Sequence, residues 1–275
     1  MNAQFHLPLL TYPDPSSFAL IQNAIDFARH QEARLRVSVF QVKIPRVSPP
    51  FPSIIDVDVE KMSADAERSS RDCAATLIET VRDYAGKADL AVTISSFEAT
   101  QPLIGDRIAE ISRIYDLSIM ETSPIASSVI ERILFESGRP LLLFPADNCC
   151  GRIDTVAIAW DGSATLARAL TGARVFLDKA SKAVLISVTD DKAIDADLRD
   201  RFAALVRDAG LAVEIVNAQS QGAPVAGTIQ SAAAEARADL LIAGGFGHSR
   251  LRELILGGVT RSLLNGLEVP VLLCH

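Results

Sequence analysis

The stretch LLIAGGFGHSRLRELILGGVT, from Leu240 to Thr260, decides which fold the rest of the chain can have. An apolar run ends in closely spaced glycines, and the later pair Gly257–Gly258 precedes a new apolar helical pattern. Glycine lets the backbone approach a ligand because it carries no Cβ. A helix that begins at such a turn presents unpaired N–H groups to an anion. The stretch therefore predicts a strand, a nucleotide phosphate loop and a helix.

Strand and helix patterns alternate along the whole chain. Runs rich in Val, Ile and Leu, typical of strands buried on both faces, are separated by segments with apolar residues at helical spacing. The expected strands are residues 5–11, 35–44, 90–97, 117–122, 141–144, 155–160, 183–188, 211–216, 240–243 and 269–273, and the expected helices are residues 18–28, 59–86, 102–115, 125–136, 166–177, 198–209, 224–238 and 259–264. In the second of these helices, Met62, Cys73, Leu77 and Val81 are expected to point inward. The alternation indicates right-handed βαβ units and a doubly wound parallel α/β sheet.

The same order of elements occurs twice, at a spacing of about 140 residues, which indicates an internal duplication. The polar residues 145–154 separate the two copies. We therefore expect two tandem doubly wound domains, residues 1–147 and residues 152–275. The edges of their last strands, which follow Leu141 and Val271, can pair within the chain as an intramolecular pseudo-dimer, and a further homodimer is left open.

Composition excludes several classes of partner. The net charge is −7, and most of the acidic excess lies in the first 150 residues, so neither copy has the basic surface that nucleic acid requires. No apolar run has the ~20 residues of a membrane helix, and no signal-peptide pattern is present, so we expect a cytoplasmic protein without a membrane partner. The four cysteines, of which Cys149 and Cys150 are adjacent, are not spaced as zinc ligands, so no metal site is expected.

Three loops of the second copy follow strand carboxyl ends, at Asp161, Val188 and Gly244. Ligands of doubly wound sheets bind at this edge, so the three loops are expected to face one crevice. The carboxylate of Asp161 can accept hydrogen bonds from ribose hydroxyls, and the glycines and the backbone N–H groups at the helix start can enclose ribose and phosphate. The predicted nucleotide-binding residues are Asp161, Val188, Gly244, Gly247, Gly257, Gly258 and Val259. Three further side chains can add positive charge near the phosphates: His248, Arg250 and Arg252.

Each of these residues also has a purely structural explanation. Asp161 with Ser163, taken alone, is most simply a turn and a helix cap. Trp160 is expected to pack against the protein rather than to hold adenine, and exposed arginines are more often solvated than bound to a ligand. The joint placement of the three loops favours a binding site.

The spacing Gly244-x-x-Gly247, nine residues and then Gly257 resembles the G-2x-G-9x-G-(S/T) signature of the universal stress protein family, in its nucleotide-binding branch. Three further segments are similar to that family's strands and to its Asp-Gly-Ser turn: residues 156–163, 238–242 and 269–273. The resemblance covers residues 152–275, and the internal repeat extends it to residues 1–147, as in a tandem member of the family.

The resemblance implies a fold and a ligand. The fold is Rossmann-like, of the adenine nucleotide alpha hydrolase-like kind, with a five-stranded parallel sheet flanked by helices in each domain. The ligand is ATP or AMP, with Mg²⁺ accompanying ATP, and any enzyme activity is at most slow ATP hydrolysis or autophosphorylation. By this match Asp161 would contact adenosine, Val188 would lie near the adenine, and the glycines with Val259 would enclose ribose and phosphates.

The sequence departs from the family pattern in two places. Gly258 stands where the family has Ser or Thr, so one hydroxyl donor to a phosphate is lost. Such a hydrogen bond is worth about 1.5–3 kcal/mol, which corresponds to a roughly ten- to hundredfold loss of ATP affinity. In the first copy, residues 121–128 contain no glycine, and Glu121 puts a negative charge at the expected phosphate position. We therefore expect no nucleotide in the first domain, which would contribute packing.

The sequence leaves three functional hypotheses. The main one is a stress-response regulatory protein that binds an adenine nucleotide in its C-terminal domain. The second hypothesis is an ATP-dependent enzyme. Such an enzyme should show a GxxxxGK[ST] loop, or a GxGxxG or Ser-Gly-Gly-x-Asp-Ser turn after its first strand, and this sequence contains none of these motifs. His6 and His30 fall in the first copy, so no Ser/His/Asp group can be assigned. The third hypothesis, an interaction or scaffold protein that has lost its nucleotide, is favoured by Gly258.

Overall fold

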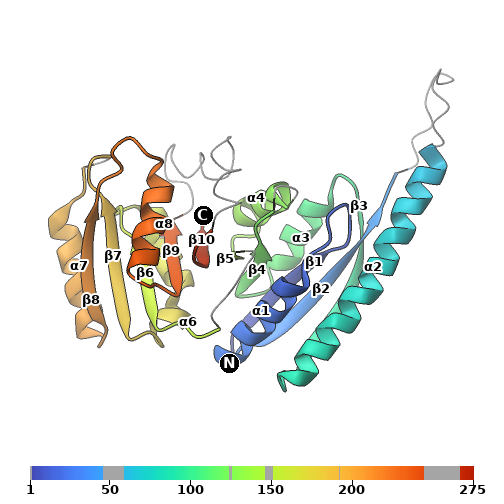
Figure 1. The fold of residues 1–275 in the computed structure, drawn as a ribbon, viewed down its shortest axis with the longest axis horizontal. Coiled ribbons are helices and arrows are strands. Elements are labelled where there is room, and N and C mark those ends of the chain that lie inside the picture. Colours follow the sequence, from blue (N-terminus) through green and yellow to red (C-terminus); the bar gives the residue numbers. More distant parts are fainter. Residues whose placement is uncertain (1, 46–58, 124–125, 146–150, 192, 245–266) are drawn as a thin grey trace.

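The structure is a computed structural model that describes residues 2–45, 59–123, 126–145, 151–191, 193–244 and 267–275 (Figure 1). We call β1 to β5 with their helices the first half, and β6 to β10 with theirs the second half. The first half consists of β1 (Gln4–Leu10), α1 (Phe18–His30), β2 (Arg34–Lys43), α2 (Val59–Lys87), β3 (Val92–Thr100), α3 (Ile104–Ser112), β4 (Leu117–Glu121), α4 (Ser127–Glu136) and β5 (Leu141–Phe144). The second half consists of β6 (Thr155–Ala159), α5 (Ala164–Gly172), α6 (Arg174–Leu177), β7 (Lys182–Val188), α7 (Ala196–Asp208), β8 (Ala212–Ala218), α8 (Val225–Glu235), β9 (Leu240–Gly244) and β10 (Val271–Cys274).

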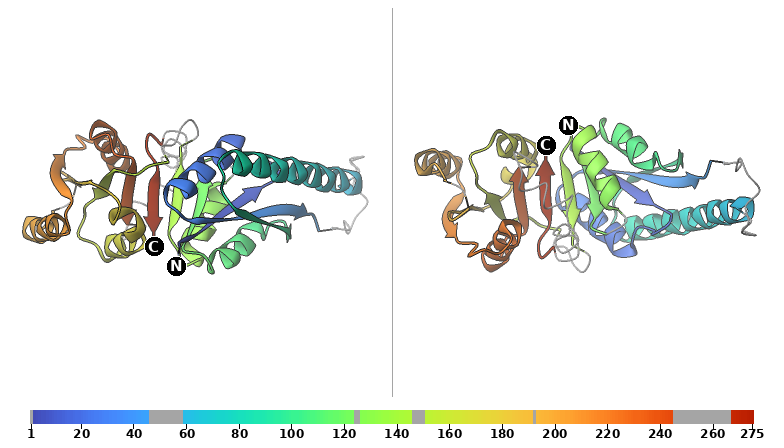
Figure 2. Two further views of the ribbon diagram at one scale, coloured as in Figure 1. Left: turned by 90° about the horizontal axis from the view of Figure 1, so that it is seen from below. Right: turned by 90° about the horizontal axis from the view of Figure 1, so that it is seen from above.

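The ten strands of the described residues belong to one sheet, in the order β3-β2-β1-β4-β5-β10-β9-β6-β7-β8. Within each half the strands are parallel, as the alternating sequence pattern predicts. The expected pairing of the last strands is confirmed, because β5 and β10 pair antiparallel with Leu142 opposite Leu272. The two halves therefore form an intramolecular pseudo-dimer, whose junction and both chain ends lie near the middle of the molecule (Figure 2).

The helices cover both faces of this sheet, and each face carries a core that continues across the two halves. One core takes its helical residues from α1, α2, α5, α6 and α7, and the other from α3, α4 and α8. At the junction, the ring of Phe27 on α1 lies 5.5 Å from Phe144 on β5 and 5.5 Å from Phe176 on α6. Residues from both halves thus fill one aromatic cluster, and the halves share an apolar core.

The helix starts show how local sequence positions the loops around the sheet edge. Ser17 and Ser163 are the N-caps of α1 and α5, and their hydroxyls accept the N–H groups of Leu20 at 3.0 Å and Leu166 at 3.1 Å. Each cap satisfies a backbone donor that the first turn of a helix leaves unpaired. The loops that follow β1 and β6 therefore end at Ser17 and Ser163, where α1 and α5 begin.

Two expectations about the helices are wrong. Met62 is 63% exposed rather than inward, because the amino-terminal part of α2 reaches beyond the sheet (Figure 1), and burial along this helix starts only at Ser70. Leu77 and Val81 are buried as expected, and Cys73 is half-buried. The helix expected over 166–177 is interrupted at Ala173 and forms α5 and α6.

The remaining expectations concern the linker, the last helix and the membrane. The pair Cys149–Cys150 and the helix expected over 259–264 lie outside the described residues. Within the part of the chain that the structure describes, no helix has both the length and the apolar character to cross a bilayer.

Candidate functional site

The carboxyl ends of β6 and β9 meet at the topological switch point of the second half. These strands are parallel neighbours, and the chain continues from β6 toward β7 on one side, while β10 lies beyond β9 on the other. Ligands of doubly wound sheets bind in the crevice outside such a point. The structure places Asp161, just after β6, and Gly244, at the end of β9, at this edge of the sheet.

Asp161 sits in a tight turn that leads into α5. Its Oδ1 atom accepts the backbone N–H of Ser163 at 2.9 Å, and Gly162 between them adopts a φ of +67°. Glycine is favoured in this left-handed region because other residues carry a Cβ penalty there. The structural role that the sequence suggested for Asp161 with Ser163 is therefore present, and one carboxylate oxygen already serves the turn.

Gly244 lies so close to the start of α5 that a side chain does not fit. A Cβ built on Gly244 would lie 2.5 Å from the backbone N of Leu166, 2.9 Å from the carbonyl carbon of Thr165 and 2.9 Å from Thr165 Oγ1. These are backbone or short side-chain atoms rather than the far end of a flexible side chain. The end of β9 can therefore pack directly against the first turn of α5, because Gly244 has no Cβ.

The neighbouring loop after β7 is fixed by a carboxylate. Val188 ends β7 and is 6% exposed. Two residues later, the carboxylate of Asp190 accepts Ser220 N at 2.8 Å, Ser220 Oγ at 3.1 Å and Gln221 N at 2.9 Å. These hydrogen bonds, led by that of the Ser220 backbone, lower the pKa of Asp190. The loops after β7 and β8 are thus tied together beside the crevice, a contact across the sheet that the residue spacing alone does not reveal.

Trp160 packs against the protein, as the sequence suggested. Its side chain is 7% exposed and stacks on Phe202 of α7, with ring centroids 4.8 Å apart. The remaining predicted site residues, and the three side chains expected to add charge, lie outside the described residues: Gly247, His248, Arg250, Arg252, Gly257, Gly258 and Val259.

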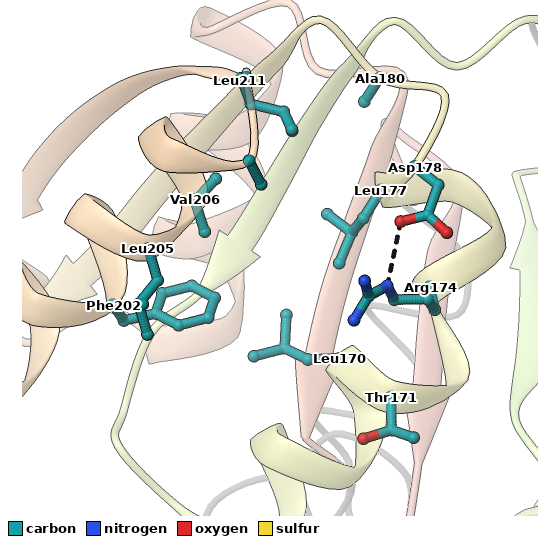
Figure 3. A pocket seen from close by; sticks show the side chains of 12 residues that line it. Leu170, Thr171, Arg174, Leu177, Asp178, Ala180, Phe202, Leu205, Val206 and Leu211 are labelled. Carbon is teal, nitrogen blue, oxygen red and sulfur yellow. Dashed lines mark hydrogen bonds and ion pairs between the residues drawn. The ribbon is translucent and has the colours of Figure 1, made fainter.

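A hollow lies elsewhere on the same half. A groove of about 750 Å³ runs between α5–α6 and α7, where Leu170 and Leu177 face Phe202 and Val206 (Figure 3). Its lining includes Leu211, which directly precedes β8, so the groove opens at the amino-terminal ends of the strands. It is therefore on the opposite edge of the sheet from Asp161 and Gly244.

His6 also has the neighbours that a catalytic histidine could use, but it is enclosed. Its Nε2 atom lies 2.9 Å from Ser38 Oγ, and its Nδ1 atom lies 3.1 Å from Ser112 Oγ and 3.3 Å from Ser118 Oγ. The residue is 0% exposed and stacks on Tyr115. Burial lowers the pKa of His6 to about 3, so the imidazole is neutral at pH 7. No substrate can reach these serines, and His6 serves the core of the first half.

The comparisons with known proteins agree with this architecture. Residues 152–275 match the model of the universal stress protein family. A universal stress protein of Archaeoglobus fulgidus is similar over 98% of this chain and 95% of that one, with 21% identity and a TM-score of 0.71. A protein of Pseudomonas aeruginosa described as a putative universal stress protein is similar over 99% and 93%, with 16% identity and a TM-score of 0.55. At these identities the likeness concerns the fold.

One shorter neighbour is a universal stress protein solved in complex with cAMP. It is similar over 45% of this chain and 98% of its own, with 26% identity and a TM-score of 0.33. No curated protein shows significant sequence similarity to the chain. The matched residues 152–275 and the two α/β halves in tandem lead to one conclusion: residues 152–275 form a domain of the universal stress protein family, and the whole chain has the fold of two such α/β units in tandem.

Proposed function

We propose that this protein is a stress-response regulatory protein that binds an adenine nucleotide, ATP or AMP, at the switch point of its second domain. The two domains are residues 1–147 and residues 152–275. The observation that carries the proposal is the close approach of Gly244 to the start of α5, directly beside Asp161. This is the edge at which doubly wound sheets bind ligands.

The residues at this edge suit the parts of an adenine nucleotide. The carboxylate of Asp161 is an acceptor for ribose hydroxyls, and the apolar side chain of Val188 suits the adenine ring. Gly244 and the motif glycines let the chain pass close to ribose and phosphates, and the backbone N–H groups near Val259 suit phosphate oxygens. Mg²⁺ accompanies ATP as the counter-ion of its phosphates.

Gly258 supports a second candidate function. The family motif has a hydroxyl residue at this position, and its loss removes one donor to a phosphate. A chain that no longer holds its nucleotide would act through contacts with other proteins, as an interaction or scaffold protein. The same site with measurable turnover would instead make the protein a slow ATPase or autophosphorylating enzyme.

The deciding experiment is calorimetric titration of the wild-type protein with ATP and with AMP, with and without Mg²⁺. The Gly258→Ser variant is measured beside it, and Gly227→Ser serves as the control because a Cβ at Gly227 of α8 meets open space. Restoring one hydrogen bond to a charged phosphate is worth about 1.5–3 kcal/mol, so Gly258→Ser should bind ATP roughly ten- to hundredfold more tightly than wild type. Gly227→Ser should match wild type.

The three functions give different results in this experiment. Binding by wild type without phosphate release supports a nucleotide-binding regulatory protein. Binding with steady phosphate release indicates an enzyme. If wild type binds neither nucleotide while Gly258→Ser does, the natural protein works without a nucleotide and the main proposal is wrong.

A further inference from the structure

The switch point of the first half is closed by a side chain of the protein itself. Glu121 ends β4, and its Oε1 atom accepts the backbone N–H of Ser17 at 2.7 Å. Its Oε2 atom accepts the Ser17 hydroxyl at 2.6 Å, and that hydroxyl in turn caps α1. Both carboxylate oxygens are therefore bound at the amino-terminal end of α1, across the crevice between β1 and β4.

Strand register shows that Glu121 stands at the position of Gly244 in the second half. The second residue of β1 is opposite the first residue of β4, and the second residue of β6 is opposite the first residue of β9. β4 and β9 both have five residues, so Glu121 and Gly244 end equivalent strands. One half thus has a glycine where the other has an acidic side chain that spans the crevice.

A second position differs in the same sense. Phe40 is opposite Phe97 on the neighbouring strand, and Val188 is opposite Ala218 in the second half. Phe40 is the seventh residue of β2, whose first residue is opposite the first residue of β1. Val188 is likewise the seventh residue of β7, whose first residue is opposite the first residue of β6, so the two positions are equivalent. Phe40 is 0% exposed and stacks on Phe97 with ring centroids 5.5 Å apart. Two aromatic rings therefore stand at the positions that the smaller side chains of Val188 and Ala218 occupy in the second half.

We infer that the first half fills its own nucleotide crevice: the Glu121 carboxylate takes the place of a bound anion at the start of α1, and Phe40 and Phe97 take the place of a base. The positive end of a helix dipole favours an anionic group at this position, and the Glu121 side chain supplies that group from within the chain. The inference rests on the proposed function for the meaning of the second crevice. It makes Glu121 the residue that restricts the chain to one nucleotide rather than two.

Hydrogen exchange measured by mass spectrometry on the full chain tests this, with ATP and with inorganic phosphate as probes. Wild type is compared with Glu121→Ala, which empties the anion position, and with Glu121→Gln, which keeps its shape without its charge. Glu98→Gln is the control, because Glu98 lies on β3 and pairs only with the exposed Lys43 at 3.6 Å among the described residues. The amides read out are those of the first turn of α1.

In wild type and in Glu98→Gln, neither probe should change the exchange of these amides. In Glu121→Ala they should exchange faster than in wild type, and phosphate at about twice its dissociation constant should slow them about threefold. In Glu121→Gln they should exchange faster than in wild type but should not respond to phosphate, because the side chain still occupies the position.

Slower exchange at the start of α1 of wild type with ATP or phosphate would show that the first crevice is open, and the inference would be overturned. It would also be overturned if Glu121→Gln exchanged at the wild-type rate, and this variant keeps the test decisive if Glu121→Ala does not fold. If ATP changes no peptide of the second half, the proposed function fails, while the phosphate measurements still decide whether Glu121 closes the first half.

Discussion

Replacing Gly244 by Ala is the sharpest test of the contact on which the candidate site depends. The added Cβ would lie 2.5 Å from the backbone N of Leu166, whereas ordinary contacts lie between 3.4 and 4 Å. The end of β9 and the start of α5 must therefore separate by about 1 Å. Leu166 N donates to the Ser163 hydroxyl at 3.1 Å, so a shift of this size strains the N-cap of α5 as well.

The magnitude follows from these two effects. Overpacking a closely packed site costs about 1–3 kcal/mol, and a weakened N-cap costs up to about 1 kcal/mol more. Gly244 carries no left-handed φ, so the cost is steric rather than conformational. With a denaturant slope of about 2 kcal/mol per M urea, a loss of about 2 kcal/mol lowers the unfolding midpoint by about 1 M.

The single tryptophan of the chain makes the assay specific for the second half. Trp160 directly follows β6, is 7% exposed and stacks on Phe202, so its fluorescence reports the unfolding of this half. Gly227→Ala is the control, because its Cβ meets open space and alanine favours the helix by about 0.5–1 kcal/mol over glycine. A Gly244→Ala midpoint equal to that of wild type would refute the close approach of β9 to α5.

Two further predictions concern the junction of the halves and the core of the first half. Gly172→Ala should lower the stability of the protein at the junction of the halves, because its Cβ would lie 2.4 Å from Pro140 Cγ of the first half. Its urea unfolding midpoint should lie below that of the control Gly86→Ala, whose Cβ meets open space. The pKa of His6 is about 3 in the folded protein and 6.5 in the unfolded chain, so between these pH values only the unfolded chain binds the proton. The contribution of the neutral imidazole to the free energy of unfolding is therefore complete above pH 6.5. It falls by up to about 1.4 kcal/mol per pH unit as the pH drops toward 3. Unfolding measured from pH 7 to pH 4.5 should therefore show a steeper loss for wild type than for His6→Gln, and equal slopes would contradict the burial of a neutral imidazole.

The sequence was sufficient to predict the order of the elements and the sheet. Strands without polar alternation and helices between them leave a parallel sheet as the arrangement that buries both strand faces. The pairing of β5 with β10 was also predictable, because two copies of one domain present equivalent edges. These predictions depend on residues close together in the chain or on the repeat itself.

Features that depend on distant residues were not predictable in the same way. The helical pattern of residues 59–86 continues through Met62, but the pattern does not say where the sheet beneath the helix ends. The break between α5 and α6 precedes Phe176, which packs on Phe27 of the other half, a contact that no local spacing encodes. At the candidate site, the sequence predicted Asp161 and Gly244 as binding residues, which stays a prediction, whereas the closeness of Gly244 to Leu166 required the packed structure.

The shared sheet also decides how the two halves can differ. Every residue of β5 and β10 is buried, so neither half can be removed without exposing an apolar strand edge of the other. The first half is therefore held in the chain by packing, independently of any ligand. The Glu121 carboxylate accepts the backbone N–H and the hydroxyl of Ser17, the N-cap of α1, so this half is stabilised at its sheet edge by one of its own side chains. The equivalent position of the second half is Gly244, which has no side chain, and under the proposed function a nucleotide contributes stability there. Under the proposed function, duplication within one sheet thus separates a half that needs no ligand from a half that a ligand can stabilise.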